Sequence, residues 1–182
     1  MLKRPKKLTV SNISKVRLAQ PLEVDSTSNG EGLRMVLWFQ GCFYECEGCH
    51  NPESWQLDGG KVYLIEDILK DIKKNQHCDG ITFSGGDPLL QSEAVLSLLK
   101  EIKKLNLNVW LYSASLYEKL IKEEQFQKIA QYVDVLVDGP FVQAKLDYSL
   151  EYRGSSNQRL IDVSKSLESD KAILYNIKQN IK

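Results

Sequence analysis

Apolar residues along this chain form short runs that alternate with helical stripes. Four runs predict strands, and the first is apolar almost throughout, as expected for a strand covered on both faces: residues 33–39, 80–83, 108–112 and 133–137. Apolar residues three and four positions apart predict helices over 64–75, after Pro88 and over 115–131. This alternation predicts an α/β fold with a parallel sheet and right-handed crossovers. Four or five such units are too few to close a barrel of about eight strands, so we expect a partial (β/α) barrel in a single domain.

The two ends of the chain are less regular. Residues 8–26 predict an extended segment, because the β-prone stretches 8–10 and 16–19 are followed by Pro21. Near the other end, residues 160–163 favour a short strand, and residues 171–175 fit either a strand or a helical turn.

Composition narrows the class of protein. Of 182 residues, 42% are hydrophobic and 26% are charged, which is typical of soluble globular proteins. The 24 basic and 24 acidic residues cancel, so neither nucleic acid nor an anionic membrane is indicated as the main partner. No apolar run reaches the roughly 18 residues of a membrane span, and the basic start is not followed by the apolar stretch of a signal peptide. We therefore expect a cytoplasmic protein, in which clustered cysteines are more often metal ligands or catalytic groups than disulfides.

Three of the four cysteines follow the first predicted strand at the spacing C-x3-C-x2-C: Cys42, Cys46 and Cys49. Three is an odd number for a disulfide framework, and three thiolates can hold a metal centre. Iron–sulfur clusters usually take four cysteine ligands. A loop that offers three would leave one iron of a four-iron cluster open to bind another ligand.

Zinc is the competing interpretation of this loop, with His50 or the pair His77 and Cys78 supplying a fourth ligand. His50 adjoins Cys49 directly, which makes simultaneous ligation awkward. His77 and Cys78 come about thirty residues later, at a predicted helix end, and Cys78 alone is simply interpreted as a small buried residue.

Further chemically suggestive residues follow the other predicted strands. Because ligands bind at the carboxyl ends of parallel strands, we expect these residues to lie on one rim with the cysteines: Ser84, Gly85, Gly86 and Asp87 after the second strand, Ser113 after the third and Asp138 after the fourth. Each has a structural alternative. Asp87 followed by Pro88 is a standard helix start, and Asp138 with its following Gly-Pro fits a simple turn. The two glycines favour a close backbone approach to a ligand, and a helix N-terminus favours a ligand carboxylate.

Four segments in this order resemble the radical S-adenosylmethionine enzymes and, more narrowly, the activating proteins of anaerobic ribonucleotide reductases. They are G-C-x3-C-x-G-C-H-N-P (41–52), S-G-G-D-P-L (84–89), V-L-V-D-G-P-F-V (135–142) and Y-R-G-S-S-N-Q (152–158). The resemblance runs from about residue 23 to 163. We therefore expect an N-terminal extension over residues 1–22 and the radical S-adenosylmethionine domain over residues 23–182.

The resemblance implies a mechanism. Cys42, Cys46 and Cys49 would ligate three irons of a [4Fe–4S] cluster, and S-adenosylmethionine would chelate the fourth. An electron from a donor such as flavodoxin or ferredoxin would then cleave the sulfonium, giving methionine and a 5′-deoxyadenosyl radical. Gly85, Gly86 and Asp87 would contact the methionine moiety, with Ser84, Ser113 and Asp138 as further cofactor contacts. The radical would remove a hydrogen from a glycine of the large reductase subunit, which stores a glycyl radical.

Some positions depart from the family pattern and keep other functions open. After the third strand this chain has Ser113-Ala114 where the family often has Thr-Gly, and alanine lacks the backbone freedom of glycine. One alternative is an enzyme of the same build acting on another protein, peptide or small molecule. The other is a zinc-stabilised interaction module without catalysis.

Overall fold

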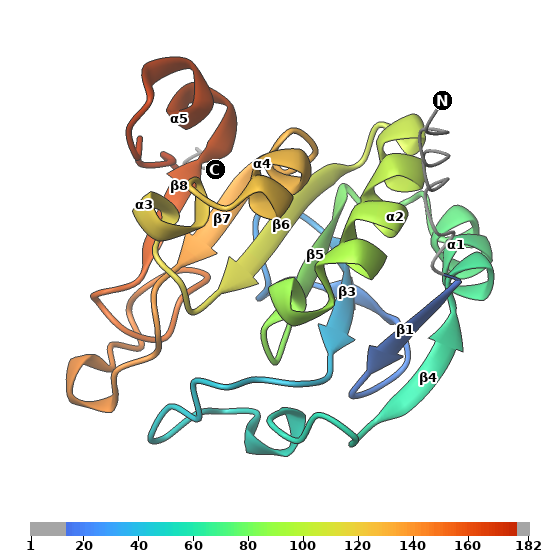
Figure 1. The fold of residues 1–182 in the computed structure, drawn as a ribbon, viewed down its shortest axis with the longest axis horizontal. Coiled ribbons are helices and arrows are strands. Elements are labelled where there is room, and N and C mark those ends of the chain that lie inside the picture. Colours follow the sequence, from blue (N-terminus) through green and yellow to red (C-terminus); the bar gives the residue numbers. More distant parts are fainter. Residues whose placement is uncertain (1–13, 178–182) are drawn as a thin grey trace, which may run out of the picture.

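The computed structural model describes residues 14–177, and its centre is a sheet of four parallel strands (Figure 1). These strands pair in the order in which they occur: β3 (Arg34–Phe39), β5 (Gly80–Gly85), β6 (Asn108–Ser113) and β7 (Val135–Asp138). The arrowheads of β3 and β6 point to the same lower edge in Figure 1. The carboxyl ends of the predicted strands therefore share one rim.

Short antiparallel strands extend this sheet on both sides. β4 and β1 lie beyond β3 in the order β4-β1-β3, β8 pairs with β7, and β2 also pairs with β3: β1 (Lys15–Leu18), β2 (Glu23–Ser26), β4 (Lys61–Leu64) and β8 (Arg159–Asp162). β1 lies within the segment expected to be an extension. The domain boundary at residue 22 stays a prediction, and the β-prone stretch 8–10 lies outside the described residues.

Helices pack against the sheet, with α2 and α4 in front of it and α1 at its β4 side in Figure 1: α1 (Ile65–Lys74), α2 (Ser92–Ile102), α3 (Tyr117–Leu120), α4 (Glu124–Ala130) and α5 (Val163–Ser169). α1 buries Ile65, Ile68 and Ile72, whose spacing forms one helical stripe. The main core joins such stripes to the apolar residues of the parallel strands. Within residues 14–177, no helix is long and apolar enough to cross a membrane.

The opposite face of the sheet is concave and carries a second, smaller core around Trp110. Arg34 lies beside it, only 1% exposed, and its guanidinium donates to Thr82 Oγ1 over 2.7 Å and to the Ile81 carbonyl over 2.9 Å. The guanidinium carbon is 5.4 Å from the Trp110 ring centroid. Burial lowers the pKa of Arg34 to about 10. A charged residue therefore fills the inner face of a strand that the sequence presents as almost entirely apolar.

The predicted α/β class with a central parallel sheet is confirmed, and so are the helix near 64–75 and the strand near 160. The single helix over 115–131 is wrong, because the structure has α3 and α4 with a break between them. Continuing the buried stripe from Leu120 at helical spacing would place Glu123 and Glu124 in the core. The helix ends instead, and α4 begins a new buried stripe at Phe126. Residues 171–175 form an isolated bridge, Ile161 with Leu174, in place of a strand.

Candidate metal and cofactor site

The cysteine loop leaves the end of β3 and returns to its own base. The Gly41 amide donates to the Ser54 carbonyl over 2.7 Å, and the Cys42 amide donates to the Trp55 carbonyl over 3.1 Å. These bonds close the loop at its neck. In Figure 1 the loop runs along the lower edge of the sheet.

Two glutamines hold the neck of the loop to the sheet. Gln40, which is 3% exposed, donates from Nε2 to the carbonyls of Glu53 (3.0 Å) and Gln56 (2.6 Å). Gln91 Nε2 donates in turn to the carbonyls of Gln40 (2.9 Å) and Arg17 (2.7 Å). Side-chain amides thus replace the missing sheet partners at this edge, which fixes where the loop begins and ends.

The three thiols of the loop are free and partly exposed. A single zinc ion holds thiolate sulfurs about 3.8 Å from one another, from zinc–sulfur bonds of about 2.3 Å in a tetrahedron. Between residues 14 and 177, three potential ligand atoms lie within 4.8 Å of one another only at Asp25, His77 and Cys78. The three sulfurs of the loop therefore do not all lie within 4.8 Å of one another. Wider spacing fits a cluster in which each thiolate binds a different iron.

Backbone amides lie near these sulfurs. The Asn51 amide donates to Cys49 Sγ over 3.4 Å. Burial raises the pKa of the Cys42 and Cys46 thiols, and nearby backbone amides, those of Tyr44 and Glu45 for Cys42 and that of Phe141 for Cys46, act in the opposite direction. Hydrogen bonds to ligand sulfurs are one of the means by which proteins set the potential of an iron–sulfur cluster.

The Ser84–Asp87 turn packs directly against the start of the cysteine loop. The Gly86 amide donates to the Phe39 carbonyl and the Asp87 amide to the Gly41 carbonyl, both over 2.8 Å. A Cβ on Gly86 would lie 2.2 Å from the Gly41 oxygen, and Gly85, with φ of +102°, would place a Cβ 2.5 Å from the Phe39 oxygen. Both glycines are therefore required by backbone–backbone contact. Contact of Gly85 and Gly86 with a ligand stays a prediction.

Asp87 and Ser113 form a buried pair beside this turn. They are 4% and 5% exposed, and Ser113 Oγ donates to Asp87 Oδ2 over 3.0 Å. The other oxygen accepts from the Leu89 amide over 3.0 Å, so the predicted helix cap is confirmed. Burial raises the pKa of Asp87, and no Lys or Arg among the described residues forms an ion pair with it. Both side chains line a cleft of about 430 Å³ together with residues of the cysteine loop.

Asp138 lies on the same rim but is fully buried and engaged by protein donors. Arg159 donates to it from Nε over 2.9 Å and also from Nη2, and the Tyr117 amide donates over 2.8 Å. Arg159 also contacts Glu118. A cofactor contact for Asp138 stays a prediction, but the structure already gives its carboxylate a role in holding α3 and β8 to the end of β7.

A larger cleft of about 660 Å³ opens on the concave face and was not expected from the sequence. Its lining includes Trp38, His50, Ser84, Tyr112 and Arg153. Arg153 Nε is buried and has no hydrogen-bond partner among the described residues, although Glu23 and Glu151 also line the cleft. An unpaired buried donor beside a cleft is suited to an acceptor from a ligand.

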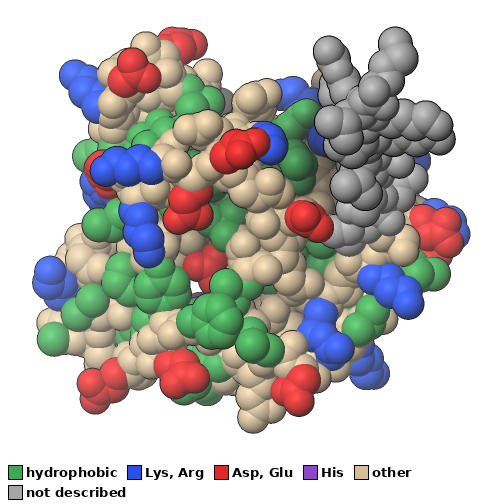
Figure 2. Space-filling model, in the orientation of Figure 1, with side chains coloured by type: hydrophobic (Ala, Val, Ile, Leu, Met, Phe, Trp, Pro, Cys, Tyr) green, Lys and Arg blue, Asp and Glu red, His purple; other side chains and the backbone are tan. Residues whose placement is uncertain are grey.

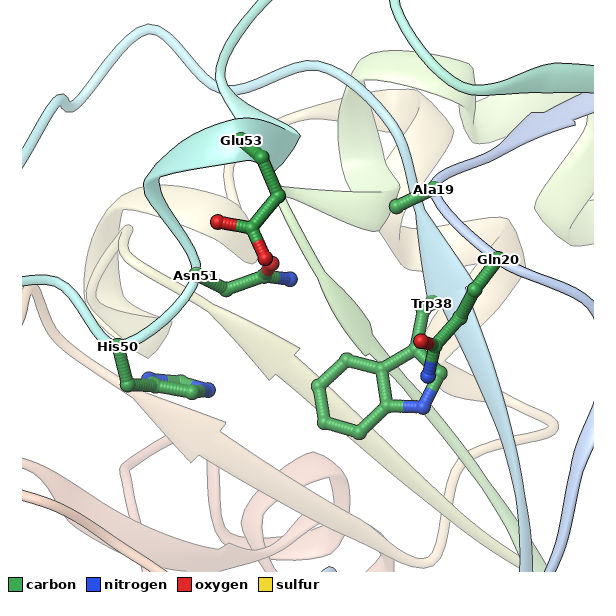
Figure 3. A pocket seen from close by; sticks show the side chains of 6 residues that line it. All are labelled: Ala19, Gln20, Trp38, His50, Asn51 and Glu53. Carbon is green, nitrogen blue, oxygen red and sulfur yellow. The ribbon is translucent and has the colours of Figure 1, made fainter.

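A pocket of about 200 Å³ adjoins this cleft and shares Trp38 and His50 with it (Figure 3). In Figure 3 the His50 and Trp38 rings face the same space, with Asn51 and Glu53 beside them. The ring centroids are 6.4 Å apart. The alternation of side chains along a strand could have indicated this cleft from the sequence. Trp38 on β3 and Tyr112 on β6 project from the face opposite to that of their strand neighbours in the main core.

Comparison with known proteins agrees with this geometry. A family model described as a 4Fe–4S single cluster domain matches residues 28–161. Several relatives carry the name anaerobic ribonucleoside-triphosphate reductase-activating protein. Those from Haemophilus influenzae and Vibrio cholerae are 36% and 38% identical to this chain over 138 residues, which is 71% of this chain and 88% of each relative. That from Escherichia coli K12 is 33% identical over 139 residues, with the same two shares.

Among solved structures, QueE from Escherichia coli aligns with 56% of this chain and 53% of its own, at 15% identity and a TM-score of 0.48. The family model, which spans the cysteine loop and the Ser84–Asp87 turn, and the relatives together show that the chain belongs to the 4Fe–4S single-cluster family and to the radical S-adenosylmethionine proteins that activate anaerobic ribonucleoside-triphosphate reductases.

Proposed function

We propose that this chain is an activase that uses a [4Fe–4S] cluster and S-adenosylmethionine to place a glycyl radical on an anaerobic ribonucleotide reductase. One observation carries the proposal: a loop with three free cysteines accepts a hydrogen bond, at its Gly41 carbonyl, from the amide of Asp87, whose buried carboxylate has no cationic partner among the described residues. The relatives named for this activity support the choice of reductase.

When bound, the cluster and S-adenosylmethionine supply the reductive cleavage of a carbon–sulfur bond that yields an organic radical. The protein's residues supply position and shelter. Cys42, Cys46 and Cys49 would hold the cluster, and the amides near their sulfurs limit how far those thiolates can turn. Asp87 would accept the ligand's ammonium group, because its burial without a cation favours a positively charged partner.

The concave cleft is the route that we propose for the reductase segment that carries the glycine. Ser84 lines this cleft, whereas Asp87, three residues later, lines the smaller one. The Ser84–Asp87 turn therefore borders both spaces. The unpaired Arg153 Nε offers a donor to a peptide carbonyl or carboxylate that enters the larger space.

Exposed apolar side chains surround the cysteine loop and fit the docking of a protein partner. Figure 2 shows hydrophobic side chains gathered over the lower part of the molecule, where the loop lies in Figure 1. The large exposed apolar residues of this region include Phe43 (70% exposed), Tyr44, Leu90 and Leu116. Phe43, Tyr44 and Leu90 also line the smaller cleft. We infer that the reductase covers this surface when the radical is transferred, which would keep water from the site.

We further infer a small electron donor such as flavodoxin or ferredoxin and a cytoplasmic location. Both inferences are supported by the chemistry of the donor set. A loop of free thiols that must hold an iron–sulfur cluster requires a reducing compartment and a source of single electrons.

The test is anaerobic. The purified chain, reconstituted with iron and sulfide, should contain about four irons, and after reduction it should convert S-adenosylmethionine to 5′-deoxyadenosine. Adding the candidate reductase should produce a glycyl radical signal in electron paramagnetic resonance. Cys46→Ala should remove the iron and both products. Cleavage without the radical signal would favour an enzyme of the same build with another substrate, and a colourless protein with stoichiometric zinc on the loop would refute the enzyme.

A further inference from the structure

A second group of potential metal ligands lies away from the cysteine loop. Asp25 on β2 and the pair His77 and Cys78, between α1 and β5, bring one oxygen, one nitrogen and one sulfur within 4.8 Å of one another. His77 Nε2 is 2.7 Å from Asp25 Oδ1, and Cys78 Sγ is 3.7 Å from the same oxygen. These three residues, separated by up to 53 positions in sequence, thus converge on one point.

This group is at the opposite edge of the sheet from the cluster site. Cys78 comes two residues before Gly80, which pairs with Arg34 at the start of β3, whereas the cysteine loop follows Phe39 at its end. Six residues of strand separate the two edges by roughly 20 Å. The group therefore cannot supply the fourth ligand of the cysteine loop that the zinc interpretation required.

The donor set matches zinc in chemistry and in spacing. Zinc is bound in proteins by Cys sulfur, His nitrogen and carboxylate oxygen, at about 2.3, 2.0 and 2.1 Å. In a tetrahedron these bonds place nitrogen and oxygen about 3.4 Å apart and sulfur and oxygen about 3.6 Å apart. The observed 2.7 and 3.7 Å need only small rotations of the exposed Asp25 and His77 side chains to reach those values.

The surroundings hold the sulfur of Cys78 in place and leave the side chains of His77 and Asp25 free to adjust. Cys78 is 3% exposed, and its thiol donates to Asp25 Oδ1 over 3.7 Å. The side chains of His77 and Asp25 are 53% and 58% exposed. The adjacent Asp79 is already committed, since its Oδ2 accepts from the Leu33 amide over 2.8 Å. A cation would therefore meet one buried thiolate, two mobile ligands and an open fourth position towards solvent.

We propose that Asp25, His77 and Cys78 bind one Zn²⁺ ion, independently of the iron–sulfur cluster. The ion takes the place of the proton shared by the histidine and the carboxylate and displaces the thiol proton of Cys78. It ties β2 to the connection that leads into β5, so that two segments distant in sequence are cross-linked at this edge. The site is separate from the proposed activase chemistry and does not depend on it.

The experiment uses the cluster-loaded protein, prepared anaerobically, equilibrated with Zn²⁺ and desalted over a weak chelator. Elemental analysis should then find about one zinc beside the iron. Asp25→Asn, His77→Ala and Cys78→Ser should each weaken zinc binding by more than about 100-fold, since even changes outside the ligand shell of metal sites cost about 10- to 100-fold. Their iron content should equal that of the unaltered protein.

His50→Ala is the matched control, because the chain has two histidines and His50 is the one on the cysteine loop. It should retain the zinc. Zinc should also raise the thermal unfolding midpoint of the unaltered protein and leave that of Asp25→Asn unchanged, which separates loss of the site from misfolding. The proposal would be overturned if the cluster-loaded protein held no zinc above background. It would also be overturned if the three variants bound zinc as tightly as the unaltered protein. Neither result would change the expected iron content or 5′-deoxyadenosine formation, so failure of the zinc site can be told apart from failure of the proposed function.

Discussion

Replacing Asp87 by asparagine separates ligand binding from folding. The residue is 4% exposed and its oxygens accept from the Leu89 amide and from Ser113 Oγ. Asparagine has the same shape and keeps one accepting oxygen for the Leu89 amide, so the turn should survive. It cannot carry the charge that pairs with the ammonium group of S-adenosylmethionine. Removing one partner of a buried, hydrogen-bonded charge pair costs about 2–5 kcal/mol, so the Kd should rise by at least about 30-fold.

The same variant should not lose stability at pH 8, although it binds the ligand more weakly. Because burial raises the pKa of Asp87, the folded protein holds this proton to a higher pH than the unfolded chain does. The contribution of Asp87 to the free energy of unfolding is therefore fully present below the unfolded pKa of about 4 and is lost as the pH rises through the folded pKa. Asparagine does not titrate. At pH 8 the variant should be at least as stable as the unaltered protein, and its relative stability should fall towards pH 5.

Two measurements on the cluster-loaded protein check this reasoning. Anaerobic titration calorimetry with S-adenosylmethionine gives the Kd, and thermal unfolding at pH 5 to 8 gives the relative stability. Asp134→Asn is the control, because this carboxylate accepts from the Val109 amide at the far end of β6 and should leave the Kd unchanged. Unaltered affinity of the Asp87→Asn protein, at equal iron content, would refute a contact between Asp87 and the ligand.

Three further substitutions test how the site is held. Asp138→Asn should lower the free energy of unfolding by about 1–3 kcal/mol, measured by denaturant titration, because it leaves Arg159 short of a buried acceptor. Gly86→Ala should reduce the iron retained after reconstitution, since its Cβ would lie 2.2 Å from the Gly41 oxygen; unchanged iron would contradict the rigid contact. Arg34→Met should cost about 3 kcal/mol or more in chemical denaturation, because buried acceptors lose their donor.

The central strands and the rim were predictable because both follow from local rules. Apolar runs with helical stripes between them define the parallel strands, and the position of Cys42 or Asp87 just after a strand places it at the carboxyl edge. The antiparallel strands were harder to predict from the sequence. β4, for example, is largely exposed and carries no apolar pattern that names its partner. Its pairing with β1 is set by residues more than forty positions away.

Side-chain partnerships across the fold were out of reach of the sequence for the same reason. Asp138 follows a strand as a ligand residue would, yet Arg159, 21 positions later, takes up its carboxylate. His77 and Cys78 look like an ordinary helix end until Asp25 is placed beside them. In each case sheet pairing brings the partner residue next to these side chains, and the pattern of residues along the sequence does not encode that pairing.

The two glycines before Asp87 show where the ligand argument now rests. On the sequence they favoured a close backbone approach to a ligand, but a Cβ on Gly86 would collide with the Gly41 carbonyl. Protein backbone therefore accounts for both glycines, and only the charge of Asp87 remains without a partner inside the turn. The same close contact strengthens the mechanism in another way. Because the Asp87 amide is bonded to the Gly41 carbonyl, the carboxylate and the first residues of the cysteine loop are held at a fixed separation. A ligand that must touch both a cluster iron and a carboxylate requires such a separation.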